Sequence, residues 1–162
     1  MKRIYSVLVE NRSGVLMKVA GLFARRNYNI DSLAVGETDD PNVSCITIVS
    51  SGDERTIEQI EKQLNKKLDV IKVKVFEENN SVNRELMLVK VKYNRNNRRD
   101  IMENCEICGA QIVDISNNHM LIQVCDTPER TAQFLKMLKG VSILEVARTG
   151  ALALQKCMDT DI

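Results

Sequence analysis

The strongest constraint on the fold is one succession of apolar patterns that occurs twice along the 162 residues. Apolar or alternating strands and helices with a 3.6-residue stripe follow one another in the order βαββαβ. In the first copy these stretches are residues 2–9, 15–23, 29–36, 43–50, 57–68 and 70–76. Such an order produces an antiparallel sheet with both helices on one face.

A second copy follows a polar stretch without periodicity, Glu77–Asn83. Its strands and helices are predicted at residues 85–93, 98–108, 110–115, 120–125, 128–139 and 141–148. The sequence therefore predicts an α+β protein with two ferredoxin-like βαββαβ domains in tandem. We place the first domain at residues 1–77, a linker at 78–84 and the second domain at 85–162.

Apolar stripes and caps locate the helices and one strand. The stripes are Val15, Leu16, Val19, Leu22 and Phe23 in the first helix, Ile57, Ile60, Leu64 and Leu68 in the second, and Ile71, Val73 and Val75 in the strand after it. Ser13 is placed to cap the first helix, and Thr127 with Pro128 forms an N-cap and N1 pair for the last one. Because the helices cover one face of each sheet, the other face is left for another sheet or subunit, and we expect at least a dimer.

Composition narrows the class of protein. Only 4% of the residues are aromatic and none is Trp, which leaves few platforms on which nucleic-acid bases could stack. The formal net charge is +1, so no strong field draws the chain to polyanions or anionic membranes. No apolar stretch approaches the roughly 18 residues of a membrane span. Five cysteines, an odd number, fit a reducing compartment, and we expect the cytoplasm.

The loop between the first strand and the first helix, Glu10–Leu16, is the candidate binding site. A helix amino terminus presents unpaired N–H groups and the positive end of the helix dipole, which suit a carboxylate. Gly14 allows close approach, Asn11 can accept a hydrogen bond from an ammonium group, and Asn29 opens the next strand beside them. Together these groups suit both ends of an α-amino acid, although each residue taken singly is also explained as a cap, a turn residue or a strand end.

Several longer motifs resemble those of one family. They are SVLVEN at residues 6–11, SGVL at 13–16, GLF at 21–23, YNIDSL at 28–33, TDDP at 38–41, QIEKQL at 59–64, RELMLVK at 84–90 and EVARTG at 145–150. On these motifs the first half resembles an ACT domain. Essentially the whole chain resembles the small, regulatory subunits of acetolactate synthase, also called acetohydroxyacid synthase.

The resemblance implies a homodimer of ACT domains that binds valine or another branched-chain amino acid at its interface. Asn11 and Gly14 of one subunit would meet Asn29 and Ile30 of its neighbour, the last two mainly through their backbone. The full set of implied effector-binding residues is Asn11, Ser13, Gly14, Val15, Leu16, Asn29 and Ile30. Two neighbouring residues depart from the family's pattern: Arg12 stands where members often carry an acidic or small polar residue, and Met17 stands where a small residue is common. A cation beside the site would favour the ligand carboxylate, and the longer side chain of Met17 would narrow the pocket.

The resemblance also implies a partner and a role. The partner is a catalytic large subunit that uses thiamine diphosphate, Mg²⁺ and FAD, whereas this chain is expected to hold no cofactor or metal and to catalyse nothing by itself. It would activate the large subunit and confer feedback inhibition on branched-chain amino-acid biosynthesis.

Three remaining features are interpreted as structural. Cys105 and Cys108 lie at the carboxyl end of a helix, lack a second ligand pair and share a face with Ile101, which favours core packing over a metal or redox site. His119 is interpreted as a turn residue, and the basic run 95–99 as a solvated loop, with a large-subunit contact as its alternative. Two other functions stay open: a stand-alone ACT-type amino-acid sensor with another partner, and an enzyme in the second half that uses Cys105, Cys108 or His119.

Overall fold

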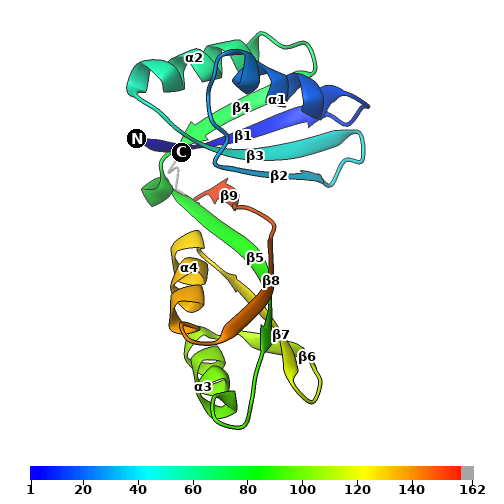
Figure 1. The fold of residues 1–162 in the computed structure, drawn as a ribbon. Helices are drawn as coiled ribbons and strands as arrows, with labels where there is room; N and C mark the ends of the chain where they lie inside the picture. The colour runs from blue at the N-terminus through cyan, green and yellow to red at the C-terminus, as the bar shows by residue number, and fades with distance from the viewer. Residues whose placement is uncertain (158–162) are drawn as a thin grey trace. The chain divides into compact units, whose positions relative to one another are not determined.

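The computed structural model describes residues 1–157, apart from the side chain of Glu78. The chain folds into two compact units. The first unit comprises Met1–Asn83 together with the segment from Ala151, and the second unit comprises Arg84–Gly150. Each unit has the predicted βαββαβ order (Figure 1). The division differs from the predicted domains at the carboxyl end, because the segment from Ala151 groups with the first unit.

The first unit is a four-stranded antiparallel sheet in the order β2-β3-β1-β4, with two helices on one face (Figure 1). Its elements are β1 Lys2–Glu10, α1 Val15–Arg25, β2 Ser32–Glu37, β3 Val43–Ser51, α2 Glu54–Asn65 and β4 Val70–Phe76. In this order β2 is an edge strand, and one of its sides is left without a neighbouring strand of the sheet.

The core of the first unit lies between the sheet and the helices. Tyr5 and Val7 point to the helix face of β1, because alternate residues of a strand share a face. They form one buried cluster with Val19 and Leu22 of α1 and Ile60 of α2, among others. Burying a side chain of this size contributes roughly 1.5–3 kcal/mol, so the cluster holds both helices on the sheet.

Three residues of the predicted stripes lie outside this core. Leu68 is 97% exposed, because α2 ends at Asn65, one turn earlier than the stripe suggested. Leu16 is 41% exposed and faces away from the sheet at the first turn of α1. Ile71 is exposed where the register between β1 and β4 shifts. Apolar spacing alone does not reveal where a helix stops or where a strand bulges.

The carboxyl segment adds a strand that the sequence patterns did not predict, β9 Leu152–Gln155. β9 pairs with β5, which begins at Ser81 inside the first unit. Ala151 and Ala153 are buried against Ile4, Val49 and Phe76, on the sheet face opposite α1 and α2 (Figure 1). Part of the face that we expected another sheet or subunit to cover is therefore covered by the chain itself.

The second unit repeats the arrangement with the sheet order β6-β7-β5-β8. Its elements are β5 Ser81–Lys92, α3 Arg98–Cys108, β6 Gln111–Ile115, β7 His119–Asp126, α4 Pro128–Met137 and β8 Ser142–Arg148. A 3₁₀ turn at Glu78–Asn80 and the start of β5 occupy the predicted linker at 78–84.

The core of the second unit joins β5, β7, α3 and α4, with Met87, Ile122 and Phe134 fully buried. The predicted cap of α4 is confirmed, since the Thr127 hydroxyl accepts a hydrogen bond from the Arg130 amide at 3.4 Å. A carboxylate, Glu85, is buried beside this core and accepts a hydrogen bond from the Thr131 hydroxyl. A buried carboxylate needs such a partner, because burying an unpaired polar group is costly.

Candidate functional site

The candidate site is built around the first turn of α1. Gly14 is the N-cap of this helix and has φ +85°, a left-handed conformation that favours glycine. The first bond of the helix ladder runs from the Lys18 amide to the Gly14 carbonyl at 3.1 Å. The amides of Leu16 and Met17 donate to no residue within the described part of the chain. The helix therefore begins with two donors that have no protein partner in this part of the chain, so a ligand carboxylate can accept from them.

The prediction that Ser13 caps α1 is wrong. Gly14 occupies the N-cap position, and no side chain makes a capping hydrogen bond there. The left-handed Gly14 turns the chain so that Ser13 lies outside the helix, exposed to solvent. The loss of this cap leaves the first-turn amides available, which favours an anion site. Val15 is buried in the core, so only its backbone could face a ligand.

Asn11 anchors the loop to the turn between β2 and β3. Its backbone amide donates to the Asn42 carbonyl at 2.7 Å. Its side-chain amide donates to the Pro41 carbonyl at 2.8 Å and to Glu37 Oε1 at 3.2 Å. The side-chain NH₂ is thus engaged, and the side-chain carbonyl oxygen is the group that remains to accept a hydrogen bond from an ammonium.

Charged groups surround the same turn. The Asp69 carboxylate is buried and accepts from Lys18 Nζ at 2.8 Å and from the Arg12 guanidinium at 2.6 Å. The Lys18 hydrogen bond first, and then the nearby charges of Lys18 and Arg12, lower the pKa of Asp69 below its ordinary value. Arg12 also pairs with Glu10. The cation that the sequence placed beside the ligand carboxylate is therefore already shared between two carboxylates of the protein.

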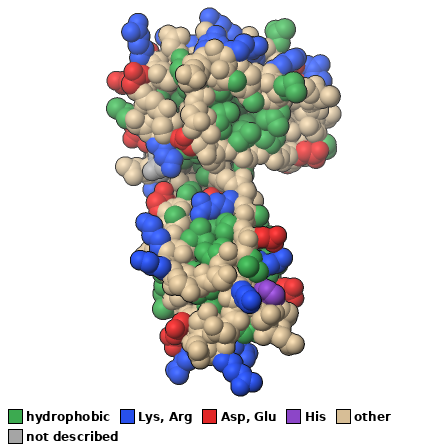
Figure 2. All heavy atoms as spheres, viewed as in Figure 1, with side chains coloured by type: hydrophobic (Ala, Val, Ile, Leu, Met, Phe, Trp, Pro, Cys, Tyr) green, Lys and Arg blue, Asp and Glu red, His purple; other side chains and the backbone are tan. Residues whose placement is uncertain are grey.

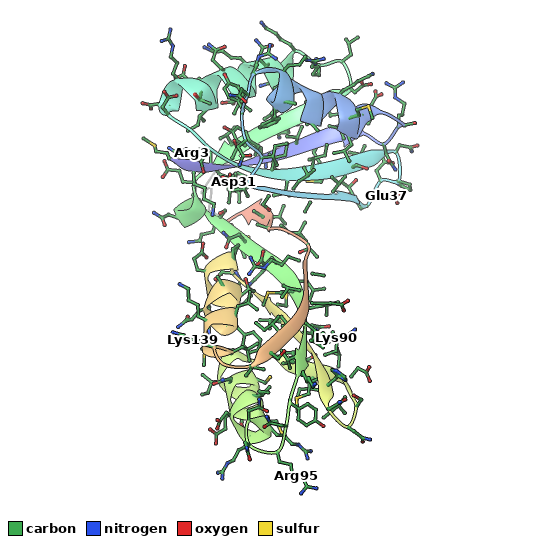
Figure 3. The ribbon with its side chains drawn as sticks, in the orientation of Figure 1. Arg3, Asp31, Glu37, Lys90, Arg95 and Lys139 are labelled. Carbon is green, nitrogen blue, oxygen red and sulfur yellow. The ribbon has the colours of Figure 1, made fainter. Side chains whose placement is uncertain are left out.

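Asn29 and Ile30 lie at the other end of β2 from this loop. Ser32 at the start of β2 pairs with Val49, whereas Glu37 at its end pairs with Ser44, next to the Asn11 loop. Figure 3 shows Asp31 and Glu37 toward these two ends. At about 3.3 Å per residue, the six residues of β2 separate the two ends by roughly 20 Å. One chain alone does not bring Asn29 to Gly14.

The local contacts of Asn29 and Ile30 keep them in place. The Asn29 carbonyl accepts from the Ser50 hydroxyl at 2.7 Å, and its side-chain amide donates to Asp31 Oδ1 at 2.7 Å. Ile30 is half-buried and packs against the core of the first unit. Both residues are therefore held by the fold before any ligand arrives.

Two residues of this region escaped the sequence analysis, Glu37 and Asp69. Glu37 holds the Asn11 side chain, and Asp69 holds Arg12 and Lys18. Glu37 is the last residue of β2 and Asp69 directly precedes β4, positions where an acidic residue is common in a sequence. Only the pairing of β2 with β3 and of β4 with β1 brings them to the loop.

The cysteine pair of the second unit belongs to its hydrophobic core, with Cys105 buried and Cys108 packed against the cluster. Cys105 is buried in the core with Ile101, as the packing interpretation predicted. Burial, with a smaller contribution from Cys108, raises the pKa of the Cys105 thiol to about 11, so it is protonated and unreactive near neutral pH. His119 opens β7 directly after a turn, where the Ser116 hydroxyl accepts its backbone amide at 3.2 Å.

Two βαββαβ units in tandem, the first with an uncapped helix amino terminus beside a sheet edge, define a regulatory protein of the ACT type. Residues 5–72 match the family of AHAS small subunit-like ACT domains, and residues 84–157 match the family described as small subunit of acetolactate synthase. The chain belongs to the family of acetolactate synthase small subunits.

Similar proteins cover nearly the whole chain. It is 45% identical over 157 residues to the acetolactate synthase isozyme 3 small subunit of Salmonella typhimurium, with 96% of each chain covered. The small subunit of the same isozyme in Escherichia coli is 44% identical over the same lengths. The crystal structure of the acetolactate synthase small subunit from Thermotoga maritima superposes with a TM-score of 0.92 at 37% identity, over 98% of this chain and 99% of that one.

Two absences hold for the described residues alone. None of the helices within residues 1–157 has the length and apolar character needed to cross a membrane. In the same part of the chain, no group of three or more His, Cys, Asp or Glu side chains is placed to hold a metal ion.

Proposed function

We propose that this chain is a cytoplasmic regulatory subunit that binds valine between two copies of its first unit and thereby inhibits the catalytic large subunit of acetolactate synthase. The observation that carries the proposal is the uncapped amino end of α1. The free amides of Leu16 and Met17 receive the ligand carboxylate, and the Asn11 carbonyl oxygen accepts from its ammonium group. Hydrogen bonds to a charged partner contribute about 1.5–3 kcal/mol each, so this turn can supply much of the affinity for a small amino acid.

The edge of the first sheet supports a two-fold dimer. If β2 pairs antiparallel with β2 of a second copy and the pairing is centred on the strand, Ser32 stands opposite the partner's Glu37. Residues just before Ser32 then lie alongside the partner's Asn11 loop. Within one chain Asn29 and the Asn11 loop lie toward opposite ends of β2, which are roughly 20 Å apart, so the neighbour's Asn29 would complete the site in the dimer.

The apolar part of the ligand is accommodated at the same interface. Leu16 is 41% exposed in the isolated chain, and Val35 is exposed on the edge strand β2. A valine side chain between Leu16 and the half-buried Ile30 of the partner subunit would bury apolar surface on both sides. Two identical sites follow from the two-fold axis.

The catalytic large subunit would supply the chemistry. A large subunit that carries thiamine diphosphate, Mg²⁺ and FAD would perform the reaction, and this chain would raise its activity when bound. Valine inhibits if it stabilises a dimer geometry that the large subunit disfavours, a coupling of about 1–3 kcal/mol in typical allosteric proteins.

The test combines the purified chain with its large subunit and follows acetolactate formation from pyruvate as valine is titrated. We expect higher activity on addition of the chain, and inhibition by valine only when the chain is present. Calorimetric titration of valine into the chain alone should give one valine per subunit. Turnover by the chain alone would reveal an enzyme, and valine binding without any effect on the large subunit would favour the stand-alone sensor.

A further inference from the structure

An open groove of about 680 Å³ runs along α3 in the second unit. One side is lined by α3 and the loop before it, and the other by Ala110 and Ile112 at the start of β6. In the sheet order β6 is an edge strand. The volume lies within the roughly 300–1,000 Å³ of typical ligand sites. Its floor reaches the core of the second unit at Cys105, Ala110 and Ile112, and none of its lining residues belongs to the candidate effector site.

Arginines give the groove its charge. Arg95 and Arg98 make no ion pair and no side-chain hydrogen bond among residues 1–157. Arg99 pairs with Glu103 at 3.4 Å, and Glu106 also lines the groove. Figure 2 shows blue side chains gathered at the end of the unit where α3 lies, and in Figure 3 Arg95 points outward from this end. Among the described residues, the groove therefore holds two arginines without an ion-pair partner.

The loop that carries Arg95 is held in one conformation by asparagines. Asn94 Oδ1 accepts from the amides of Asn96 and Asn97 at 2.9 and 3.0 Å. Asn97 Oδ1 in turn accepts from the Asn94 amide at 2.8 Å. These bonds fix the backbone from which the Arg95 side chain projects, as Asx turns do at the start of many helices.

The groove also has an apolar part and a limited length. Met102 is 45% exposed on α3, opposite the half-buried Ile112 of β6. A helix beside an edge strand is an arrangement in which an extended peptide segment can add to the strand. The far end of β6 is poorly suited to pair with an added strand. The register shifts after Ile112, and the Asp114 carboxylate accepts a hydrogen bond from the Ile115 amide at 3.0 Å. Only a short segment fits.

We propose that this groove docks a short, extended, acidic segment of the catalytic large subunit. Its carboxylates face Arg95 and Arg98, and an apolar side chain packs on Met102 and Ile112. The proposal rests on the function proposed above and assigns to the second unit a contact that the valine site does not use. Nucleic acid fits less well, because no aromatic side chain lines the groove.

The test uses the full chain with Arg95→Glu and Arg98→Glu together, and measures its affinity for the purified large subunit by calorimetry or interferometry. We expect affinity at least about tenfold weaker than that of the parent chain, and less dependent on salt. Because Arg98 is the first residue of α3, a glutamate there suits the helix dipole, so the variant should unfold at an unchanged or higher temperature. Met102→Ala should weaken the same binding by about threefold to tenfold.

Lys136→Glu with Lys139→Glu is the matched control, since it reverses two exposed cations of the same unit, Lys136 in the last turn of α4 and Lys139 just after this helix (Figure 3). Equal loss of affinity in this control would overturn the proposal, because net charge alone would then explain the result. If the arginine variant binds the large subunit as tightly as the parent chain does, the groove is not the docking site, although the proposed function still stands. A parent chain that fails to bind the large subunit would overturn both. If the parent chain binds single-stranded RNA and the arginine variant does not, while both bind the large subunit equally, the groove is a polyanion site and the proposal is wrong.

Discussion

Gly14→Asp tests the placement of the ligand carboxylate most directly. A Cβ at Gly14 would meet no atom within 4 Å, so the new side chain enters open space at the start of α1. The conformation at φ +85° is strained for a residue with a side chain, by about 1–3 kcal/mol, but aspartate tolerates it better than most. A negative charge at a helix amino terminus recovers about 0.3–1 kcal/mol. The variant should therefore fold.

The expected loss of affinity follows from charge repulsion and competition. Two carboxylates about 4 Å apart repel by about 4 kcal/mol at the effective dielectric constant near a protein surface. The new carboxylate also competes for the Leu16 and Met17 amides that the ligand needs. At 1.4 kcal/mol per decade, valine should bind at least about a hundredfold more weakly, and we expect no inhibition at concentrations that inhibit the parent complex.

Gly14→Asn provides the control. Asparagine has nearly the same shape and also tolerates a left-handed backbone, but it carries no charge. It should retain most of the affinity that the aspartate variant loses, as measured by calorimetric titration with valine alongside thermal unfolding of each variant. A folded Gly14→Asp protein that binds valine within about threefold of the parent would refute the site as described.

Further predictions concern the neighbour's contribution, a buried charge and the added strand. Asn29→Ala should weaken valine inhibition in the assembled enzyme while leaving one cooperative thermal transition, because its side chain is exposed and, among the described residues, bonds only to Asp31; loss of that transition would mean that Asn29 is needed for folding instead. Asp69→Asn should destabilise the first unit at neutral pH. Since the pKa of Asp69 is lowered in the folded chain, the stability it contributes is complete above its ordinary value of 3.8 and is lost as pH falls through the native value, so parent and variant should converge in acid denaturation. Ala153→Asp should lower the free energy of unfolding by more than about 2 kcal/mol, whereas Leu154→Asp should change it by less than about 0.5 kcal/mol. Ala153 is 5% exposed and Leu154 is 72% exposed, so equal effects in denaturant titrations would contradict the burial of β9.

The charge network behind the loop explains why Arg12 is compatible with an amino-acid site. A free guanidinium beside the α1 turn would compete with the helix amides for the ligand carboxylate. Asp69 and Glu10 hold the Arg12 guanidinium instead, and Asp69 also holds Lys18. A carboxylate bound as proposed would thus meet mainly backbone donors, whose positions are fixed by the helix.

The βαββαβ order of both units could be predicted because each element satisfies its own local requirements. The stripe of Val15, Val19 and Leu22 repeats every three to four residues, and α3 begins and ends at the residues that its pattern indicates. Thr127 and Pro128 fix the start of α4 through the capping bond and the proline φ. These signals lie within a few residues of one another and need no tertiary contact.

The sequence predictions that were wrong or incomplete share a different cause. Ser13 has the side chain of a good cap, yet the left-handed Gly14 takes the cap position. Leu68 continues a spacing after the helix has ended. β9 was missed because LALQ is too short to stand out, and it becomes a strand only where β5 offers an edge and the first sheet offers an apolar face.

The sequence by itself determined the two units, the helix that faces the candidate ligand and, through its motifs, the family. Only the tertiary structure decided that Glu37 and Asp69 meet the Asn11 loop, that Asn29 lies at the opposite end of β2, and that the carboxyl segment returns to the first unit. The physical reason is the sequence separation over which each kind of interaction acts. Periodicity and capping act over one or two turns of chain, whereas strand register and side-chain pairing join residues separated by tens of positions, and no local pattern records which partner they will find.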